Sequence, residues 1–275
     1  MNPVAFHLGP LTIRWYGILV ALGFLAAFVF CLKRARERNM SPDRVSDLLL
    51  WVMVGGIAGA RLSYVFYEWR QFISDPWEIL RVDHGGLVFY GGLVGAVVAV
   101  LIWGRIRRMN ILELGDILAP AVPLGHAVGR VGCFLNGCCF GHPYEGFCSV
   151  RYLPGSAAAH VQSAKDLLES PLAAPHPVFP IQLVAALTNL LLVAVLLWAE
   201  KRFGLRYRLF ALYMLLYGVT RVVIEFGRGD YLERLGLFTP SQVISLFIVA
   251  AGALLWRLGT KATDERLRPV EGTHG

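Results

Sequence analysis

The sequence is poor in charged residues. Asp, Glu, Lys and Arg make up 16% of its 275 residues, whereas a soluble globular domain carries about 25%. Hydrophobic residues reach 56%, and apolar stretches of about 20 residues, the length that crosses ~30 Å of hydrocarbon, recur along the chain. This composition excludes an ordinary water-soluble fold and predicts an all-α, polytopic membrane helical bundle.

Other absences narrow the class further. The apolar segments are continuous rather than alternating, which argues against a β-barrel. The first apolar run starts near Leu11 without a basic leader or a small-residue cleavage site, so we expect a permanent first span and not a cleaved signal peptide. Neither an internal repeat nor a low-complexity tract is visible, which fits one compact bundle.

Seven spans are predicted, and they form one membrane domain over residues 1–257. Their approximate limits are 12–32, 46–67, 86–103, 111–128, 179–199, 208–226 and 240–257. Residues 130–178 are expected to form a small extracytoplasmic cap, rich in loops, with one short helix around Val161–Glu169. Residues 258–275 are expected to be a disordered cytoplasmic tail.

Basic residues orient these spans. Of the 26 Lys and Arg residues, 16 lie in the segments that follow the first, third, fifth and seventh spans. By the positive-inside rule, the N-terminus and the cap are then outside and the C-terminus is cytoplasmic. This topology explains the net charge of +7, and no nucleic-acid partner is expected.

The sixth predicted span carries polar residues on one helical face. The spacings of four, four, four and three residues place on that face Tyr213, Tyr217, Arg221, Glu225 and Arg228. An arginine deep in a bilayer costs about 2.5–3.5 kcal/mol, so it normally faces protein or a wet cavity. Two interpretations follow: a buried Arg221–Glu225 pair that joins helices, or a cavity stripe whose guanidinium binds an anion such as phosphate.

Two further features leave alternatives open. Arg61 is a second intramembrane cation, for which helix packing and function are equally good interpretations. Five glycines open the third span around "GGLVFYGGLVG" (85–95), where they permit close approach of a neighbouring helix or of a ligand. His84 and Tyr90 flank the first glycine pair, and both side chains can carry protons.

The stretch "GRVGCFLNGCCFG" (129–141) follows the fourth span. Its four glycines predict that no regular helix continues beyond Arg130, and loop amides together with Arg130 would form an anion-binding nest. The candidates for disulfides in an oxidising compartment are Cys133, Cys138, Cys139 and Cys148. A zinc site is the less favoured alternative, because the cysteine spacing resembles none of the usual paired knuckles.

In combination these motifs resemble one protein family from end to end. The matching stretches are "LGPLTIRWYGILVALGF", "GARLSYVFY", "GGLVFYGGLVG", "GRVGCFLNGCCFG", "FPIQL", "YGVTRVVIEFGRGD" and "PSQVIS". They are similar to those of the bacterial prolipoprotein diacylglyceryl transferases, whereas the cap matches only loosely.

The resemblance implies an enzymatic activity. Such enzymes transfer the diacylglyceryl group of phosphatidylglycerol to the lipobox cysteine of a prolipoprotein, the first step of bacterial lipoprotein maturation, and release glycerol-1-phosphate. The resemblance further implies a multi-pass protein of the bacterial cytoplasmic membrane that acts as a monomer without metal or other cofactor. Its partners would be phosphatidylglycerol, the prolipoprotein signal peptide with its lipobox, and the lipid bilayer.

Residue roles follow from the same resemblance. The residues assigned to catalysis are Arg221, Tyr90, His84 and Glu225. The residues assigned to phosphatidylglycerol binding are Arg130, Tyr16, Tyr217, Gly91, Gly92, Asn136 and Gln182.

The chain also departs from the familiar pattern. Familiar members carry His at the place of Tyr90, Asn at Cys133 and Glu at Cys138, and their motif after the cap reads "HPSQLYE" where residues 179–185 read "FPIQLVA". The identity of the proton acceptor is therefore open among Tyr90, whose reference pKa is near 10, His84 and His126.

Two other functions are compatible with the residues. One is a membrane thiol–disulfide oxidoreductase that uses the outside cysteines, although the sequence has no Cys-x-x-Cys element. The other is a phospholipid binder or transporter that uses the same phosphate site without chemistry. The sequence leaves open how the cysteines pair, which acyl chains are preferred and whether the protein is a specialised paralogue.

Overall fold

The computed structural model describes residues 3–9, 11–73, 75–81, 85–231 and 238–267. Within these residues, seven helices are long and apolar enough to cross a membrane, which confirms the predicted seven-span helical class. The chain divides into two compact units. The larger unit comprises Met1–Val29 and Leu118–Gly275, and the smaller comprises Phe30–Ile117.

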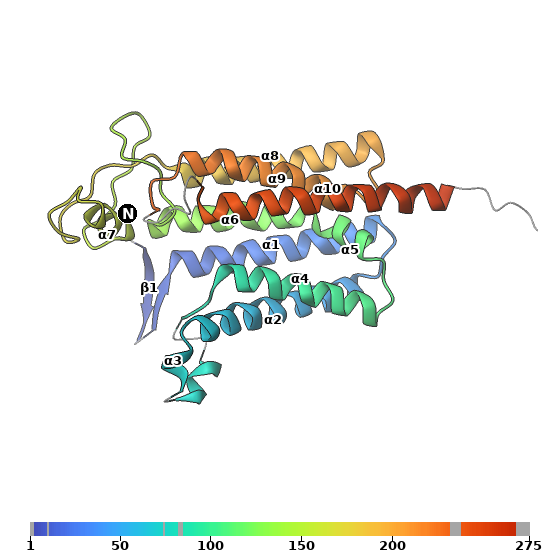
Figure 1. Ribbon diagram of the computed structural model, residues 1–275, viewed down its shortest axis with the longest axis horizontal. Coiled ribbons are helices and arrows are strands. Elements are labelled where there is room, and N and C mark those ends of the chain that lie inside the picture. Colours follow the sequence, from blue (N-terminus) through green and yellow to red (C-terminus); the bar gives the residue numbers. More distant parts are fainter. Residues whose placement is uncertain (1–2, 10, 74, 82–84, 232–237, 268–275) are drawn as a thin grey trace, which may run out of the picture. The chain divides into compact units, whose positions relative to one another are not determined.

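Most elements along the chain are helices (Figure 1). The elements are β1 (Val4–Leu8), β2 (Leu11–Arg14), α1 (Trp15–Glu37), α2 (Pro42–Tyr67), α3 (Trp69–Phe72), the 3-10 helix η1 (Pro76–Leu80), α4 (Phe89–Ile106), α5 (Ile111–Leu118), α6 (Ala121–Asn136), α7 (Ala157–Ala164), α8 (Ile181–Phe203), α9 (Leu209–Phe226) and α10 (Pro240–Leu267).

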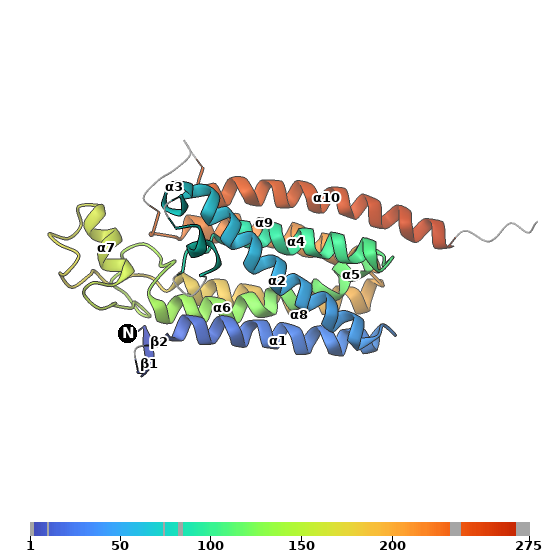
Figure 2. The same ribbon diagram turned by 90° about the horizontal axis from the view of Figure 1, so that it is seen from below.

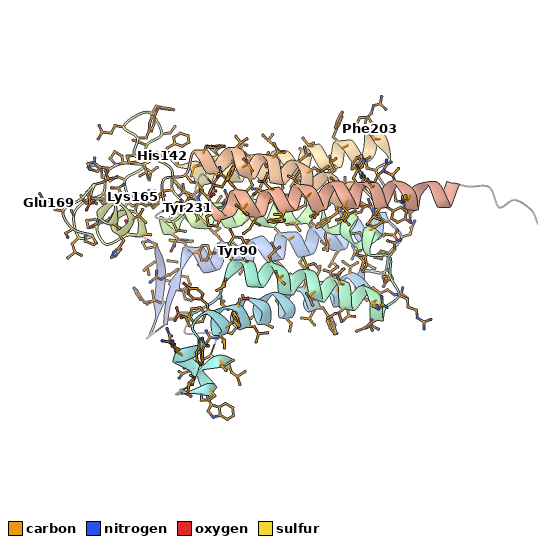
Figure 3. The ribbon with its side chains drawn as sticks, viewed as in Figure 1. Tyr90, His142, Lys165, Glu169, Phe203 and Tyr231 are labelled. Carbon is orange, nitrogen blue, oxygen red and sulfur yellow. The ribbon has the colours of Figure 1, made fainter. Side chains whose placement is uncertain are left out.

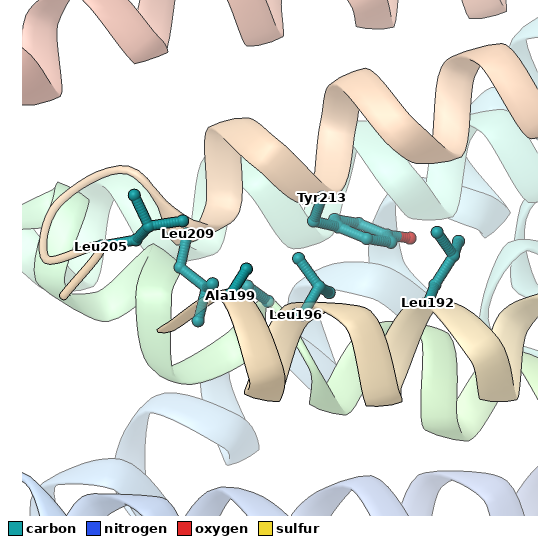
Figure 4. Packing of buried hydrophobic residues seen from close by; sticks show 7 residues of the cluster. Leu192, Leu196, Ala199, Leu205, Leu209 and Tyr213 are labelled. Carbon is teal, nitrogen blue, oxygen red and sulfur yellow. The ribbon is translucent and has the colours of Figure 1, made fainter. Parts of the chain in front are cut away.

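In the larger unit, α6, α8, α9 and α10 run alongside one another (Figures 1 and 2). Between α8 and α9, the buried side chains of Leu192 and Leu196 face Leu209 and Tyr213 (Figure 4). The start of α1 packs on α6, where a methyl group added to Gly125 would lie 2.9 Å from the carbonyl oxygen of Gly23. Lipid tails are as apolar as these side chains, so close packing, and not the hydrophobic effect, joins the helices.

In the smaller unit, α2 and α4 run side by side along a seam of glycines (Figure 1). A methyl group added to Gly59 of α2 would lie 2.8 Å from the Cα of Gly95 on α4, and one added to Gly55 would lie 2.7 Å from Ala99 Cβ. Real Cβ atoms do not come this close to neighbouring atoms. The glycines therefore let the two backbones touch, the small-residue packing common in membranes.

Several boundaries differ from the expected ones. The first helix begins at Trp15 because residues 4–14 pair as an antiparallel hairpin, β1 with β2, which turns at Gly9 (φ 59°). The short cap helix is α7, which starts before the expected position because the Ser156 side chain accepts a hydrogen bond (3.3 Å) from the Ala159 N–H. Such a cap satisfies one of the free amides at a helix start.

The last helix extends beyond the limit expected at Arg257. α10 continues to Leu267, so residues 258–267 are helical where a disordered tail was expected. Six of the ten residues in this stretch are good helix formers: Leu258, Lys261, Ala262, Glu265, Arg266 and Leu267. The remainder of the expected tail, residues 268–275, lies outside the described residues.

The glycine seam generates a stability prediction. Gly59→Ala should lower the free energy of unfolding by about 1–3 kcal/mol, the usual cost of overpacking, because its methyl group meets the backbone of α4. The midpoint of thermal unfolding in detergent measures this. Gly17→Ala is the matched control, since a methyl group there meets no atom within 4 Å. Equal midpoints for the two variants would contradict the packing role.

Candidate active site

We call residues 129–141 the arginine loop. Its non-helical part begins later than its glycines indicate. The expectation that helix ends near Arg130 is wrong: α6 continues through Gly132 to Asn136 and ends at Gly137, which has φ 75°. Each glycine weakens a helix by roughly 1 kcal/mol, but an unsatisfied backbone group in hydrocarbon costs several. Gly132 also packs closely, since a methyl group there would lie 3.2 Å from Leu19 Cβ.

Arg130 is held by a histidine one turn earlier on α6. Its Nε donates a hydrogen bond of 3.0 Å to Nε2 of His126. A guanidinium only donates, so this imidazole nitrogen keeps its lone pair for Arg130. The nomination of His126 as the proton acceptor therefore loses its support, and His126 acts as a positioning partner of Arg130.

The same histidine connects α6 to α9. The His126 ring lies 5.7 Å from the ring of Tyr217, and Arg221 follows Tyr217 by one helical turn. The positive charges of Arg130 and Arg221 both act on the His126 ring. The His126 ring thus links Arg130 on α6 to Tyr217 on α9, one helical turn before Arg221.

Glu225 lies near the C-terminal end of α9, where it contacts two arginines. Its Oε2 forms an ion pair with Nη1 of Arg221 and lies 3.7 Å from Nη1 of Arg228. Its Oε1 accepts a hydrogen bond of 2.6 Å from Thr239 Oγ1, just before α10. The Glu225 side chain has no exposed area. Arg221 and Glu225 pair as expected, and both interpretations of the pair stay open.

Further bonds fix the orientation of Arg221. Its Nη2 donates to Ser241 Oγ at 3.0 Å and to the Tyr231 hydroxyl at 3.4 Å. The two acceptor hydroxyls are themselves 2.8 Å apart. Burial raises the pKa of Tyr231, so this hydroxyl stays protonated and uncharged beside the guanidinium.

A small pocket opens beside this network. Its volume is about 90 Å³, which at ~30 Å³ per water is room for roughly three waters or one small anionic group. The lining residues are His142, Lys165, Glu225, Phe226, Arg228, Tyr231, Thr239 and Gln242. Figure 3 places His142, Lys165 and Tyr231 at the cap end of the larger unit.

Arg228 supplies the fixed charge of the pocket. Its Nε and Nη2 donate to the two carboxylate oxygens of Asp230 at 2.9 and 2.7 Å, and its guanidinium lies 4.4 Å from the Tyr231 ring centroid. Burial lowers the pKa of Arg228, but the hydrogen bond and the charge of Asp230 outweigh burial and raise it.

Sequence reasoning missed most of the pocket lining. His142 and Lys165 come from the cap, where the sequence shows no periodicity that would bring them to the end of α9. The His142 ring contacts the Phe226 carbonyl oxygen at 3.2 Å, and Lys165 donates to the Gly229 carbonyl oxygen at 2.6 Å. The motif "PSQVIS" was a usable signal for Ser241 and Gln242, which lie in it.

Gln182 holds the arginine loop. Its side chain is buried, and its Nε2 donates to the Cys138 carbonyl oxygen at 2.8 Å and to the Tyr152 hydroxyl at 3.2 Å. Tyr152 in turn donates to the Phe134 carbonyl oxygen at 3.1 Å, and burial raises its pKa to about 12. Both amide hydrogens of Gln182 are used within the protein, whereas its Oε1 is buried without a hydrogen-bond partner among the described residues, so its assignment to lipid binding stays a prediction.

Three of the four outside cysteines lie together. The Sγ atoms of Cys133, Cys138 and Cys139 are all within 4.8 Å of one another, and Cys148 is exposed and outside this group. All five cysteines of the chain are free thiols in the structure, so an oxidised pair stays a prediction. Hydrogen bonds from the Cys133 and Cys138 side chains lower the pKa of Cys139, and the charges of Arg228 and Arg130 act in the same direction.

Two other predicted lipid contacts adjoin the thiols. Tyr16, at the start of α1, is exposed, and its ring lies against Gly132. Asn136 is the last residue of α6 and forms a side-chain hydrogen bond with Cys138.

The predicted glycine contacts belong to the smaller unit. A methyl group on Gly91 would collide with Ser63 of α2, and one on Gly92 would lie 3.2 Å from the Gly56 carbonyl oxygen. Helix packing fills the space beside the Cα atoms of both glycines, and their assignment to lipid binding stays a prediction. Tyr90 is the second residue of α4 and is 40% exposed. His84 lies outside the described residues.

Arg61 has a structural role within the smaller unit. It donates to the carbonyl oxygens of Ile79 (3.0 Å), Gly85 (2.7 Å) and Gly86 (3.2 Å), and also to that of Glu78. Its guanidinium also lies over the rings of Tyr64 and Phe72. Of the two interpretations, the structure supports packing: Arg61 fastens the segment before α4 to α2.

The role of Gln182 is testable. Gln182→Met keeps the volume but removes both donors, so it should destabilise the protein by about 1–3 kcal/mol, the usual cost of an unsatisfied buried polar group. Hydrogen exchange should show faster exchange confined to the arginine loop. Leu187→Ala, a change at an exposed residue of the same helix, is the control. Unchanged protection of the loop in Gln182→Met would contradict the positioning role.

Comparison with known proteins identifies one family over nearly the whole chain. The family model of prolipoprotein diacylglyceryl transferase matches residues 3–258. A phosphatidylglycerol–prolipoprotein diacylglyceryl transferase of Clostridium tetani is 32% identical over 263 positions, which cover 94% of this chain and 98% of the relative. Enzymes of the same name from Synechococcus elongatus and Xylella fastidiosa are 35% and 33% identical and cover 98% of this chain, with 92% and 96% of the relatives matched. The chain belongs to the prolipoprotein diacylglyceryl transferase family.

Proposed function

We propose that this protein transfers the diacylglyceryl group of phosphatidylglycerol to the lipobox cysteine of prolipoproteins and releases glycerol-1-phosphate. The family match over nearly the whole chain supports this activity. The observation that supports it most directly is that Arg130 bonds to His126, whose ring faces Tyr217 one helical turn before Arg221. Guanidiniums suit a phosphate ester, because each can donate two parallel hydrogen bonds.

The chemistry is a substitution at carbon. The thiolate sulfur of the acceptor attacks the glycerol methylene that bears the phosphate, so that an S–C bond forms and the C–O bond breaks. The electron pair of that bond leaves on the phosphate oxygen. Negative charge therefore grows on the departing group, and fixed cations stabilise it more in the transition state than in the bound lipid.

Arg130 is the residue we assign to the headgroup phosphate. Its Nε is used by His126, which leaves the terminal Nη groups, a planar pair of donors, for two phosphate oxygens. Tyr16 and Tyr217, near the thiols and the His126 ring respectively, are assigned to hydrogen bonds with the headgroup, together with Asn136.

Arg221 is the residue we assign to the departing phosphate. Its Nη groups are held by Glu225, Ser241 and Tyr231, so the charge is already in place before the substrate binds. Glu225 also faces Arg228, and Asp230 pairs with Arg228 in turn, so the two guanidiniums lie beside two carboxylates.

The proton of the acceptor thiol needs a separate explanation. The lone pair of His126 is used by Arg130, and a phenol such as that of Tyr90 is not a common general base. His84 stays a nominee from the sequence. We assign to Tyr90 a hydrogen-bonding role and not the role of general base.

The protein is a multi-pass protein of a bacterial membrane. We place its N-terminus and the cap outside and its C-terminus in the cytoplasm, on the positive-inside distribution of its 26 basic residues. We take the acting form to be a monomer. In this orientation, the arginines at the cap end of α6 and α9 meet substrates from the outer leaflet.

The activity itself is tested by mass spectrometry. Incubation of the purified protein with phosphatidylglycerol and a lipobox peptide should add the mass of one diacylglyceryl group to the peptide. A peptide with serine in place of cysteine is the control and should gain no mass. If the protein binds the lipid but the cysteine peptide gains no mass, the transferase hypothesis is wrong and the protein is a phospholipid binder.

The role of Arg130 is tested by substitution. Arg130→Gln should lower the transfer rate by about 10²–10³-fold, as expected when a fixed donor to a developing charge is lost. Initial rates of peptide lipidation measure this. Arg202→Gln, an exposed arginine at the opposite end of α8, is the matched control and should transfer at the parent rate. Full activity of Arg130→Gln would contradict the assignment of Arg130 to the headgroup phosphate.

A further inference from the structure

The three clustered thiols have the geometry of a metal site that their spacing conceals. Two left-handed residues, Gly137 (φ 75°) and Cys139 (φ 59°), turn the chain back at the end of α6. This turn returns Cys138 and Cys139 to Cys133, so that the three Sγ atoms lie within 4.8 Å of one another. A side chain rarely adopts positive φ without a reason, and here the conformation aims a thiol at two others.

The distances suit zinc. With Zn–S bonds of about 2.3 Å, two sulfurs of a tetrahedral site lie about 3.8 Å apart. The thiols therefore need to approach one another by about 1 Å at most, a movement within the reach of small side-chain rotations. All three residues are partly buried, so the sulfurs are confined near these positions.

The surroundings hold the loop in place. Gln182 donates to the Cys138 carbonyl oxygen, and Tyr152 donates to that of Phe134 on the last turn of α6. Both side chains are buried. Metal ligands in proteins are oriented by such supporting hydrogen bonds, and this support comes from α8 and from the cap.

The charges also fit. Three thiolates and one Zn²⁺ carry a net charge of −1, which a buried site must balance. Arg228 and Arg130 both act electrostatically on the Cys139 sulfur. Because Arg228 is paired with Asp230, Arg130 supplies the positive charge that offsets the −1 of the site.

We propose that Cys133, Cys138 and Cys139 bind one Zn²⁺ ion and leave its fourth position for the thiol of the acceptor cysteine. Among the residues that the structure describes, no further His, Cys, Asp or Glu joins the group, and three protein ligands with one open position typify catalytic zinc. The role of the fourth position rests on the transferase function proposed above. This proposal departs from the metal-free activity that the family resemblance implies.

Zinc would supply what the other residues lack. A thiol bound to zinc is deprotonated, and each of the four cysteines releases its proton to water on binding. The acceptor sulfur is then a thiolate at neutral pH without a strong protein base. It forms the S–C bond as described, the C–O electron pair leaves with glycerol-1-phosphate, and no oxidant or reductant is consumed.

Metal binding is measured first, on the full chain in detergent. The reduced, metal-free protein should bind one Zn²⁺, counted by elemental mass spectrometry after gel filtration, and Co²⁺ should produce thiolate-to-metal charge-transfer bands. Cys133→Ser and Cys139→Ser should each weaken binding by more than the about 100-fold typical for loss of a supporting group. Cys148→Ser, an exposed cysteine outside the cluster, should bind like the parent.

The open position is measured on the unaltered chain, which avoids any folding defect of a variant. A lipobox peptide with cysteine should change the Co²⁺ charge-transfer bands, and the peptide with serine should leave them unchanged. Removal of metal by a chelator should abolish peptide lipidation, and Zn²⁺ should restore it.

The outcomes separate the two proposals. Failure to bind metal, equal binding by all variants, or an oxidised pair among the three cysteines in an active enzyme would overturn the zinc site. Undiminished lipidation after complete metal removal would overturn it as well and leave the transferase intact. A zinc-loaded protein that coordinates the peptide thiol but never lipidates it would overturn the transferase and keep the site.

Discussion

Inside a bilayer no water can satisfy a backbone amide or carbonyl group, and this constraint governs the structure. It explains why apolar stretches become helices and why α6 passes through three glycines to Asn136. The helix ends only where Gly137 adopts the left-handed conformation that satisfies the last carbonyls. The position of that end matters, because it places Arg130 on a helix and the thiols of Cys138 and Cys139 on the turn after it.

The same constraint applies to charges. A buried ion without a partner costs several kcal/mol, so each intramembrane charge has fixed partners. Arg61 donates to backbone carbonyls within the smaller unit, where Asp116 is also paired with Arg38 at 3.4 Å. Glu225 in the larger unit serves two arginines. The difference decides the roles: carbonyl groups hold Arg61 in a packing position, whereas carboxylates hold Arg228 beside a pocket.

The site in the larger unit is assembled from segments far apart in the chain. α6 contributes His126 and Arg130, the end of α9 contributes Arg221 and Glu225, and the cap contributes residues that close the pocket. Zinc held by the arginine loop would activate the nucleophile next to the guanidiniums that receive the leaving group. Nucleophile and leaving group would then be stabilised by neighbouring parts of one loop and two helices, without a dedicated base.

Local patterns in the sequence were sufficient for the spans, because hydropathy depends only on neighbours in the chain, and for the Arg221–Glu225 pair, because residues four apart on a helix always meet. Glycine and glutamine could not be interpreted in this way. Whether Gly91 faces lipid or α2, and whether Gln182 faces a substrate or a loop carbonyl, depends on which surface packs against it. The bond between Arg130 and His126 and the meeting of three thiols likewise depend on the true end of α6. The sequence alone therefore determined the membrane class and the family, while tertiary packing decided which polar groups face one another, because those contacts join residues that no local periodicity relates.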